Sequence, residues 1–297
     1  MSDTLSARRR FTSWLTGADP VSTNPVSTDP EEHPMTDEHT STLPTSIDTA
    51  LHERESLDIG PVRRLRIRVT SGEVDVIGRD EPGARIEVHE AAGHSLPVRL
   101  EDGMLRIGTD RILGTGSRAV VTVTVQRNAE VEIDGTSAAI LASGMKQGLE
   151  IRTVSGDVVC DATAGQVRLE GVSGELALRE HEGSVELTTV SGPATASGAV
   201  TRFDATGVSG DLFLDLEAPD RVDVRTVSGE TVLRLGAERP ADYTVSSVSG
   251  SLHLDGAEIG RLLGGYRGSW GAGDAQPTRV RVESSSGTVR IVHADVE

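Results

Sequence analysis

Hydrophobic and polar residues alternate along most of the chain after residue 62. The first such segment, VRRLRIRVTSGEVDVIG, begins at Val62 and turns at Ser71 and Gly72. Alternation with a period of two places one set of side chains on one face of an extended strand. Further alternating segments, ARIEVHE, LPVRLEDGMLRIG and AVVTVTVQRNAEVEI, follow at irregular spacing. The pattern predicts irregular N-terminal β-coils over residues 56–142.

A stricter repeat covers residues 143–297. Ser-Gly pairs recur in it, and the steps between their glycines after Gly156 are 18, 18, 18, 19, 21 and 37 residues. Gly165 and Gly183 mark half-steps of nine residues. Together with one early turn, the predicted turn glycines are Gly72, Gly156, Gly174, Gly192, Gly210, Gly229, Gly250 and Gly287. A fixed period of this kind indicates nine-residue strand–turn units that work in pairs.

Apolar residues keep step with these glycines. They occur two and four residues after most of them, as in Val74 and Val76, Val158 and Cys160, Leu176 and Leu178, Leu212 and Leu214, Leu252 and Leu254, and Val289 and Ile291. Residues two apart share one face of a strand, so each pair is expected to point inward. The sequence therefore predicts an all-β, single-stranded β-solenoid with 18 residues per coil and parallel stacking of the coils.

The Ser-Gly turns have a recurring composition, as in TVSGDV, GVSGEL and GVSGDL. Glycine is expected there because the backbone would need a positive φ angle. The serine before it is expected to hydrogen bond to local backbone or to the adjacent coil. Both expectations give these turns a structural role.

Two segments depart from the strand pattern. Residues 1–55 are rich in Ser, Thr, Pro and acidic residues, a composition that predicts a disordered tail. Met35 lies within this tail and is an alternative start to Met1. Residues 260–278, GRLLGGYRGSWGAGDAQPT, interrupt the repeat and are expected to form a Gly-rich loop. This loop carries Tyr266 and Trp270, which makes these two aromatics the candidate contact surface.

Composition and charge narrow the range of partners. Aromatic residues make up only 2% of the chain, so the core must be filled mainly by aliphatic side chains. The net charge of −17 argues against binding to nucleic acid or to anionic lipid. The single cysteine, Cys160, excludes an intrachain disulfide and is expected in the core. Neither a secretory signal nor a membrane span is evident, so a cytoplasmic location is expected.

Candidate chemistry is sparse, and we expect no catalytic, cofactor or metal site. The chain contains no G-x-S-x-G motif, and its histidines lack the spacing of a zinc site. Acidic residues follow several turn glycines and could form a column in the stacked coils: Glu73, Asp157, Glu175, Asp211 and Glu230. Such a column could bind calcium, or it could be a solvated edge that keeps the stack soluble. The solvated edge is favoured because Pro193, Ser251 and Thr288 interrupt the column.

The repeated motif [TG]-V-S-G-[DE]-[VL]-x-[LV] resembles a bacterial, adhesin-type family of unknown function, also called toastrack or DUF4097. The resemblance covers roughly residues 60–295. It implies a β-solenoid fold, no established catalysis and an association with envelope or membrane-stress systems. The leading hypothesis is a non-enzymatic scaffold that binds a protein partner. The alternative is a polysaccharide- or cation-binding module that uses the acidic column or the Gly-rich loop.

Overall fold

The computed structural model of the protein describes residues 46–91, 95–108, 118–237, 239–261, 265–272 and 275–294. These residues lie in one compact unit, Thr42–Glu297. The regular elements assigned in the described part are all β-strands. No helix in this part of the chain has the length and hydrophobicity needed to cross a membrane.

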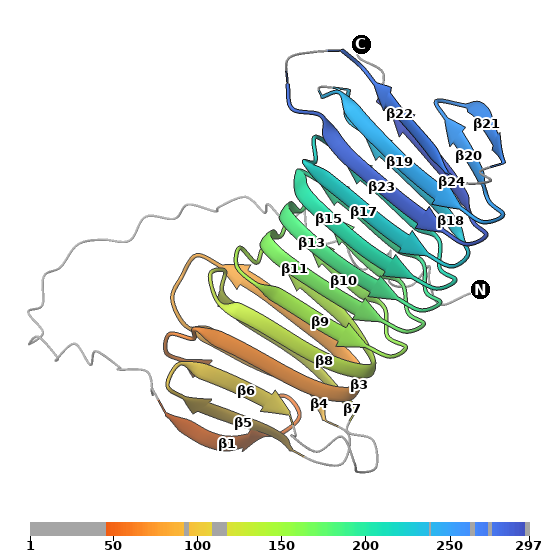
Figure 1. Ribbon diagram of the computed structural model, residues 1–297. Helices are drawn as coiled ribbons and strands as arrows, with labels where there is room; N and C mark the ends of the chain where they lie inside the picture. The colour runs from red at the N-terminus through yellow and green to blue at the C-terminus, as the bar shows by residue number, and fades with distance from the viewer. Residues whose placement is uncertain are drawn as a thin grey trace, which may run out of the picture. The chain divides into compact units, whose positions relative to one another are not determined.

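The strands form two faces that enclose the core between them (Figure 1). In spatial order, the first face contains β1 (Ile47–Leu51), β5 (Leu96–Glu101), β6 (Met104–Gly108), the first parts of β3 (Arg64–Arg79) and β8 (Glu130–Ser143), β9 (Leu149–Thr153), β11 (Ala164–Gly171), β13 (Glu182–Thr189), β15 (Val200–Gly207), β17 (Arg221–Thr226), β23 (Thr278–Ser284), β19 (Ala241–Ser247) and β22 (Tyr266–Trp270). The second face contains β2 (Ser56–Ile59), β4 (Ala84–Ala91), β7 (Arg118–Gln126), the second parts of β3 and β8, β10 (Val158–Asp161), β12 (Leu176–Arg179), β14 (Ala194–Gly198), β16 (Leu212–Leu216), β18 (Glu230–Leu235), β24 (Thr288–His293), β20 (Ser251–Leu254) and β21 (Ala257–Arg261). Because β3 and β8 pair with neighbours in both faces, the two faces are joined into one sheet, which has 24 strands in the described part of the chain.

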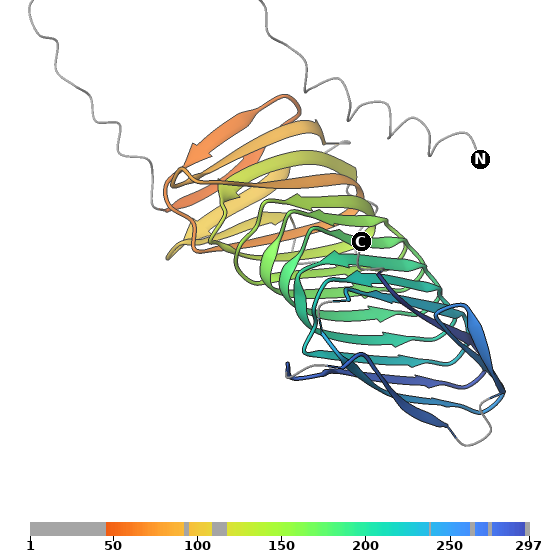
Figure 2. The same ribbon diagram turned by 90° about the horizontal axis from the view of Figure 1, so that it is seen from above.

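The strand register confirms the predicted β-solenoid. Val158 lies beside Leu176, Leu176 beside Ala194, and Ala194 beside Leu212, so parallel neighbours are 18 residues apart. One strand from each face forms a layer, and the layers are visible as stacked rungs in Figure 2. The predicted inward pairs are buried, except that Leu254 is only partly buried. Each layer thus contributes aliphatic side chains from both faces to a continuous core.

The order of the layers in space differs from their order in the sequence. The last strand pair, β23 and β24, lies between the β17–β18 layer and the β19–β20 layer. At one end of the stack, β4 and β5 run antiparallel to β7 and β6. At the other end, β21 and β22 run antiparallel to β20 and β19. Antiparallel strands therefore cover the parallel stack at both ends.

Two predicted boundaries need correction. Residues 1–45 lie outside the described residues, but strand β1 falls inside the predicted 1–55 tail. This strand forms because Ile47 and Leu51 pair with Leu100 and Leu96 of β5, a contact that local composition does not reveal.

The predicted loop over residues 260–278 contains strand β22, which pairs with β19. Tyr266, Gly268 and Trp270 alternate with more exposed residues, so the segment has the period of a strand despite its glycines.

The predicted reason for the turn glycines is wrong for most of them. Of the eight, only Gly72 and Gly229 have a positive φ angle. A Cβ atom on Gly174 would instead lie 2.0 Å from the carbonyl oxygen of Gly156, and one on Gly192 would lie 1.9 Å from that of Gly174. Glycine is required because the backbones of successive layers are in direct contact at the turn.

Candidate functional site

The Ser-Gly turns of five successive layers form one continuous corner between the two faces, hereafter the Ser-Gly corner (residues 154–157, 172–175, 190–193, 208–211 and 227–230). At four of the five turns the serine hydroxyl donates to the valine carbonyl of the preceding layer, and at the first turn Ser155 donates to the Thr136 carbonyl. The Oγ–O distance is 3.1 Å from Ser173 to Val154 and 3.1 Å from Ser191 to Val172. The backbone N–H of each of these serines donates to the same carbonyl. The serines therefore do what the sequence predicted, since they bond to the adjacent coil.

The valine side chains of this corner point away from the core. We call Val154, Val172, Val190, Val208 and Val227 the valine ladder. Each of them is between 42% and 50% exposed. With layers about 4.8 Å apart, the five side chains form an apolar line roughly 19 Å long. Isolated exposed valines are common on soluble proteins, but a line of them in successive layers is not.

The predicted acidic column lies at the same corner, three residues after the valine ladder in each turn. Asp157, Glu175, Asp211 and Glu230 are its members at the corner, and Pro193 interrupts it. Two of these carboxylates help to join the layers: Asp157 Oδ1 accepts the Glu175 N–H at 2.9 Å, and Asp211 Oδ1 accepts the Glu230 N–H at 2.8 Å. Within the described residues, no three His, Cys, Asp or Glu side chains come together as a metal-binding group.

A second, mainly apolar column lies on the outer side of the second face. Strand register aligns its members, which are Leu141, Val159, Ala177, Thr195, Phe213 and Val232. Phe213 is the most exposed of them, at 43%, whereas Ala177 is buried and Thr195 is polar. The acidic column is thus bordered by the valine ladder on one side and by this column on the other. The arrangement offers a partner apolar contacts and negative charge in parallel lines.

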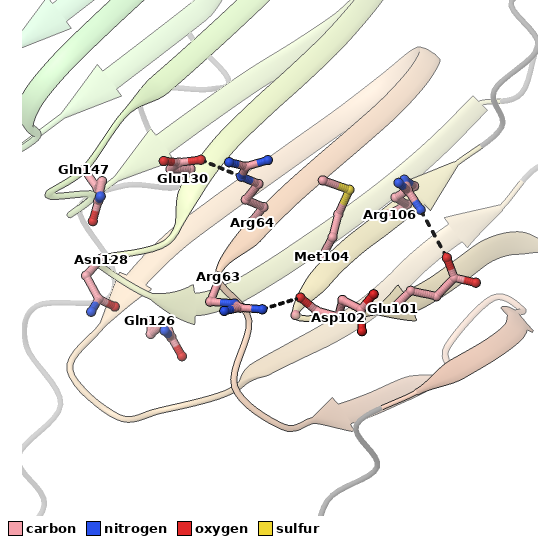
Figure 3. Close-up of a pocket in the computed structure, with 11 residues that line it drawn as sticks. Arg63, Arg64, Glu101, Asp102, Met104, Arg106, Gln126, Asn128, Glu130 and Gln147 are labelled. Atoms are coloured by element: carbon pink, nitrogen blue, oxygen red, sulfur yellow. Dashed lines mark hydrogen bonds and ion pairs between the residues drawn. The ribbon is translucent and has the colours of Figure 1, made fainter.

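A polar hollow of about 670 Å³ lies at the opposite corner, near the N-terminal end of the stack (Figure 3). Its arginines come from the start of β3 and from β6, and amide side chains of the β7–β8 and β8–β9 turns line the other side. Three arginines inside it are already held: Arg64 by Glu130 at 2.7 Å, Arg106 by Glu101 at 3.6 Å, and Arg63 by the carbonyl of Asp102 at 2.8 Å. The hollow therefore presents mostly neutralised charge.

The two aromatics predicted as a contact surface lie at the C-terminal end of the stack. Tyr266 and Trp270 belong to β22 and are partly buried against the core. The indole of Trp270 stacks on His293, with ring centroids 3.8 Å apart and planes within 2°. Both side chains help to close the end of the stack, and a contact surface there stays a prediction.

A chain of hydrogen bonds accompanies this aromatic cap. His293 Nδ1 lies 2.9 Å from Asp255 Oδ1, and its Nε2 bonds to the hydroxyl of Tyr243. The order Asp–His–Tyr resembles the carboxylate–imidazole–hydroxyl order of a catalytic triad, in which the hydroxyl would have to reach a substrate. Tyr243 is 2% exposed, burial raises its pKa, and Trp270 covers the imidazole. The arrangement favours a structural role for these residues.

Sequence reasoning missed the valine ladder. The signal was present, because a valine precedes nearly every Ser-Gly pair of the repeat. The periodicity could not show whether this valine is buried or exposed, because a β-branched residue next to a turn is compatible with both positions. Only the stacking of the turns shows that these valines face solvent.

The sequence was compared with models of protein families and with curated proteins. The family model described as Toastrack DUF4097 matches residues 62–292. Among the curated proteins, none matches this chain.

Several solved structures are distantly similar. A "putative lipid binding protein" from Parabacteroides distasonis is 14% identical, with a TM-score of 0.49, over 83% of this chain and 98% of that one. A "putative adhesin" from Parabacteroides merdae is 14% identical, with a TM-score of 0.48, over 80% and 95% of the two chains. A further "putative adhesin" from Bacteroides fragilis is 11% identical, with a TM-score of 0.45, over 80% and 96%. Matches this distant carry no information on partners. The family match is informative because it covers residues 62–292, which is most of the sequence. The chain belongs to the Toastrack DUF4097 family.

Proposed function

We propose that the protein is a non-catalytic scaffold that binds a protein partner along the Ser-Gly corner. The observation that carries this proposal is the valine ladder. Contiguous apolar surface on a soluble protein is most often a place where another molecule binds. The ladder also lies on a rigid support, since each turn is held to the next by two hydrogen bonds from serine.

The fold does not require valine at these positions. Thr136 and Ser285 occupy the equivalent place in other layers, where their carbonyls accept the same serine N–H bonds from Ser155 and Ser249. Threonine has the branched shape and strand preference of valine but is polar. A preference for β-branched residues therefore explains the shape of these side chains and not their hydrophobicity. Five valines in successive layers favour a binding role for the apolar surface.

The reactive groups of the chain favour a scaffold over an enzyme. Burial raises the pKa of the Cys160 thiol to about 12, so it is not a thiolate nucleophile near neutral pH. The repeated corner serines donate to backbone carbonyls and have no histidine beside them among the described residues. The family resemblance further favours a role in adhesion or envelope-stress signalling.

Site-specific crosslinking would test the proposal. A photoreactive amino acid replaces Val190 in the full chain within its host, and a matched variant carries it at Val292. Val292 is 39% exposed but lies on β24, away from the corner. We expect a protein adduct from position 190 only. The purified partner should then bind the purified chain and bind Val190→Lys at least roughly tenfold more weakly. Equal adducts at both positions, or unchanged binding by Val190→Lys, would refute a corner-binding scaffold.

A further inference from the structure

The charge beside the valine ladder narrows the chemistry of the partner. Asp157, Glu175 and Asp211 have no cationic side chain paired with them among the described residues, whereas Glu230 is paired with Arg290. The chain as a whole carries a net charge of −17. Unpaired carboxylates next to an apolar line attract a surface that combines hydrophobic and basic residues.

The spacing of the ladder narrows the shape of the partner. Its valines repeat about every 4.8 Å, and the apolar stripe of an α-helix repeats about every 5.4 Å, one turn. Over the five layers of the ladder, the accumulated mismatch is only about 2–3 Å, which side-chain rotamers can absorb. Alternate residues of an extended strand are about 6.6 Å apart, so a strand lying along the ladder would lose register within two or three layers.

We infer that the Ser-Gly corner binds a basic amphipathic α-helix, a proposal that rests on the protein-binding function above. The helix lies along the stack with its apolar stripe on the valine ladder. Its Lys and Arg side chains lie over Asp157, Glu175 and Asp211. At 1.5 Å per residue, covering the ladder takes a helix of about 13 residues. The apolar residues of the helix that meet the ladder would recur at i, i+3, i+4 and i+7.

Two other occupants fit the corner less well. A second copy of this chain would bring a second acidic column to the same interface, and like charges oppose each other there. An anionic lipid surface would meet the same repulsion. A basic helix alone satisfies both the apolar line and the carboxylates.

A peptide titration tests the inference. The probe is a fluorescent helix of about 18 residues, made of Leu and Lys with leucines at i, i+3, i+4 and i+7. It is titrated with the full chain and followed by anisotropy at low and moderate salt. Two peptides serve as controls: one of equal composition with Leu and Lys alternating, and one with Glu in place of Lys. We expect the helical basic peptide to bind at least roughly tenfold more tightly than either control.

Protein variants separate the apolar contribution of the valines to peptide binding from the electrostatic contribution of the carboxylates. Val190→Thr with Val208→Thr should weaken peptide binding by roughly tenfold, because two half-exposed valines lose their apolar contact. Glu175→Gln with Asp211→Asn should weaken it and reduce its salt dependence. Asparagine keeps the oxygen that accepts the Glu230 N–H. The matched control, Val292→Thr, should bind like the wild type.

Three results would overturn the inference. The first is equal binding of the alternating or the acidic peptide, and the second is unchanged binding by the valine variant. The third is a dimer of the wild-type chain in light scattering that the valine variant abolishes, since the corner would then bind a second copy. A partner that crosslinks at Val190 through a surface other than a basic helix would refute this inference alone and leave the scaffold function standing.

Discussion

Replacing Gly210 with alanine should destabilise the stack strongly, and replacing Gly207, the last residue of β15 just before the same turn, should not. A Cβ atom on Gly210 would lie 2.0 Å from the carbonyl oxygen of Gly192 in the neighbouring layer. Carbon and oxygen atoms that are not bonded need more than 3 Å, so the two layers must move apart by about 1 Å or more. A Cβ atom on Gly207 would meet only a methyl group of Thr189, at 3.8 Å. The two glycines are three residues apart, which makes them a matched pair.

The loss of stability expected for Gly210→Ala can be worked out from the hydrogen bonds that hold these layers together. The Ser209 N–H and hydroxyl both donate to the Val190 carbonyl, at 2.8 and 3.2 Å, and the Ala194 N–H donates to the Asp211 carbonyl at 2.9 Å. A net contribution of about 0.5–1.5 kcal/mol each gives a loss of about 2–4 kcal/mol for Gly210→Ala. Gly207 has no positive φ, so alanine there should be neutral or stabilise by up to about 1 kcal/mol.

Urea unfolding followed by far-ultraviolet circular dichroism would measure both variants against the wild type. A lower midpoint for Gly210→Ala with an unchanged or higher midpoint for Gly207→Ala is the expected result. Equal midpoints for the two variants would refute backbone contact as the reason for the turn glycines. Gly210→Ala should also increase hydrogen exchange at Ser209 before it does so in distant layers, because the strain is local.

Four further predictions test other parts of the structure. Gly174→Val should lower the melting temperature far more than Glu175→Ala, because only the first adds atoms against Gly156. Phe203→Ala should cost about 3–5 kcal/mol in urea unfolding, since this fully buried side chain would leave a cavity. Cys160 should resist alkylation at pH 8 in the native protein and react once the protein is denatured, because its pKa is raised to about 12. Burial, together with the nearby charge of Glu73, raises the pKa of Asp75 to about 6 in the folded protein. As the pH rises, the unfolded chain therefore loses the Asp75 proton at lower pH than the folded chain does. The contribution of Asp75 to stability should fall between about pH 4 and pH 6. Asp75→Asn should remove that fall and be more stable at pH 7 by about 1–2 kcal/mol, after allowance for the solvent that still reaches the carboxylate.

The sequence was sufficient to predict the layer and its core. Val158 and Cys160, or Leu176 and Leu178, stand at fixed distances from a glycine, and a strand of period two can bury only one such set. The 18-residue step then fixes which side chains stack on which. The alternation within a strand and the glycine of the turn before it are both local signals, because they lie within nine residues of each other.

The order of the layers could not be predicted from the sequence, because the repeats are chemically interchangeable. β23 pairs with β17 and with β19, and either edge would accept the same alternating valines. The end strands were missed for a related reason. β1 and β22 are short and are stabilised by pairing with β5 and β19, so their own residues carry little signal.

The candidate site follows from the same turn that builds the fold. In each turn the glycine has no room for a side chain, and the serine is used to bind the preceding layer. The residue before them contributes only its carbonyl to that bond, so its side chain faces solvent and is free to vary. Substitution of Val190 or Val208 should therefore change what the corner binds without changing how the layers stack. Under the proposed function, the serine and glycine of each turn hold the layers together while the valine before them contacts the partner, so substitutions at the valine should alter binding with little effect on stability.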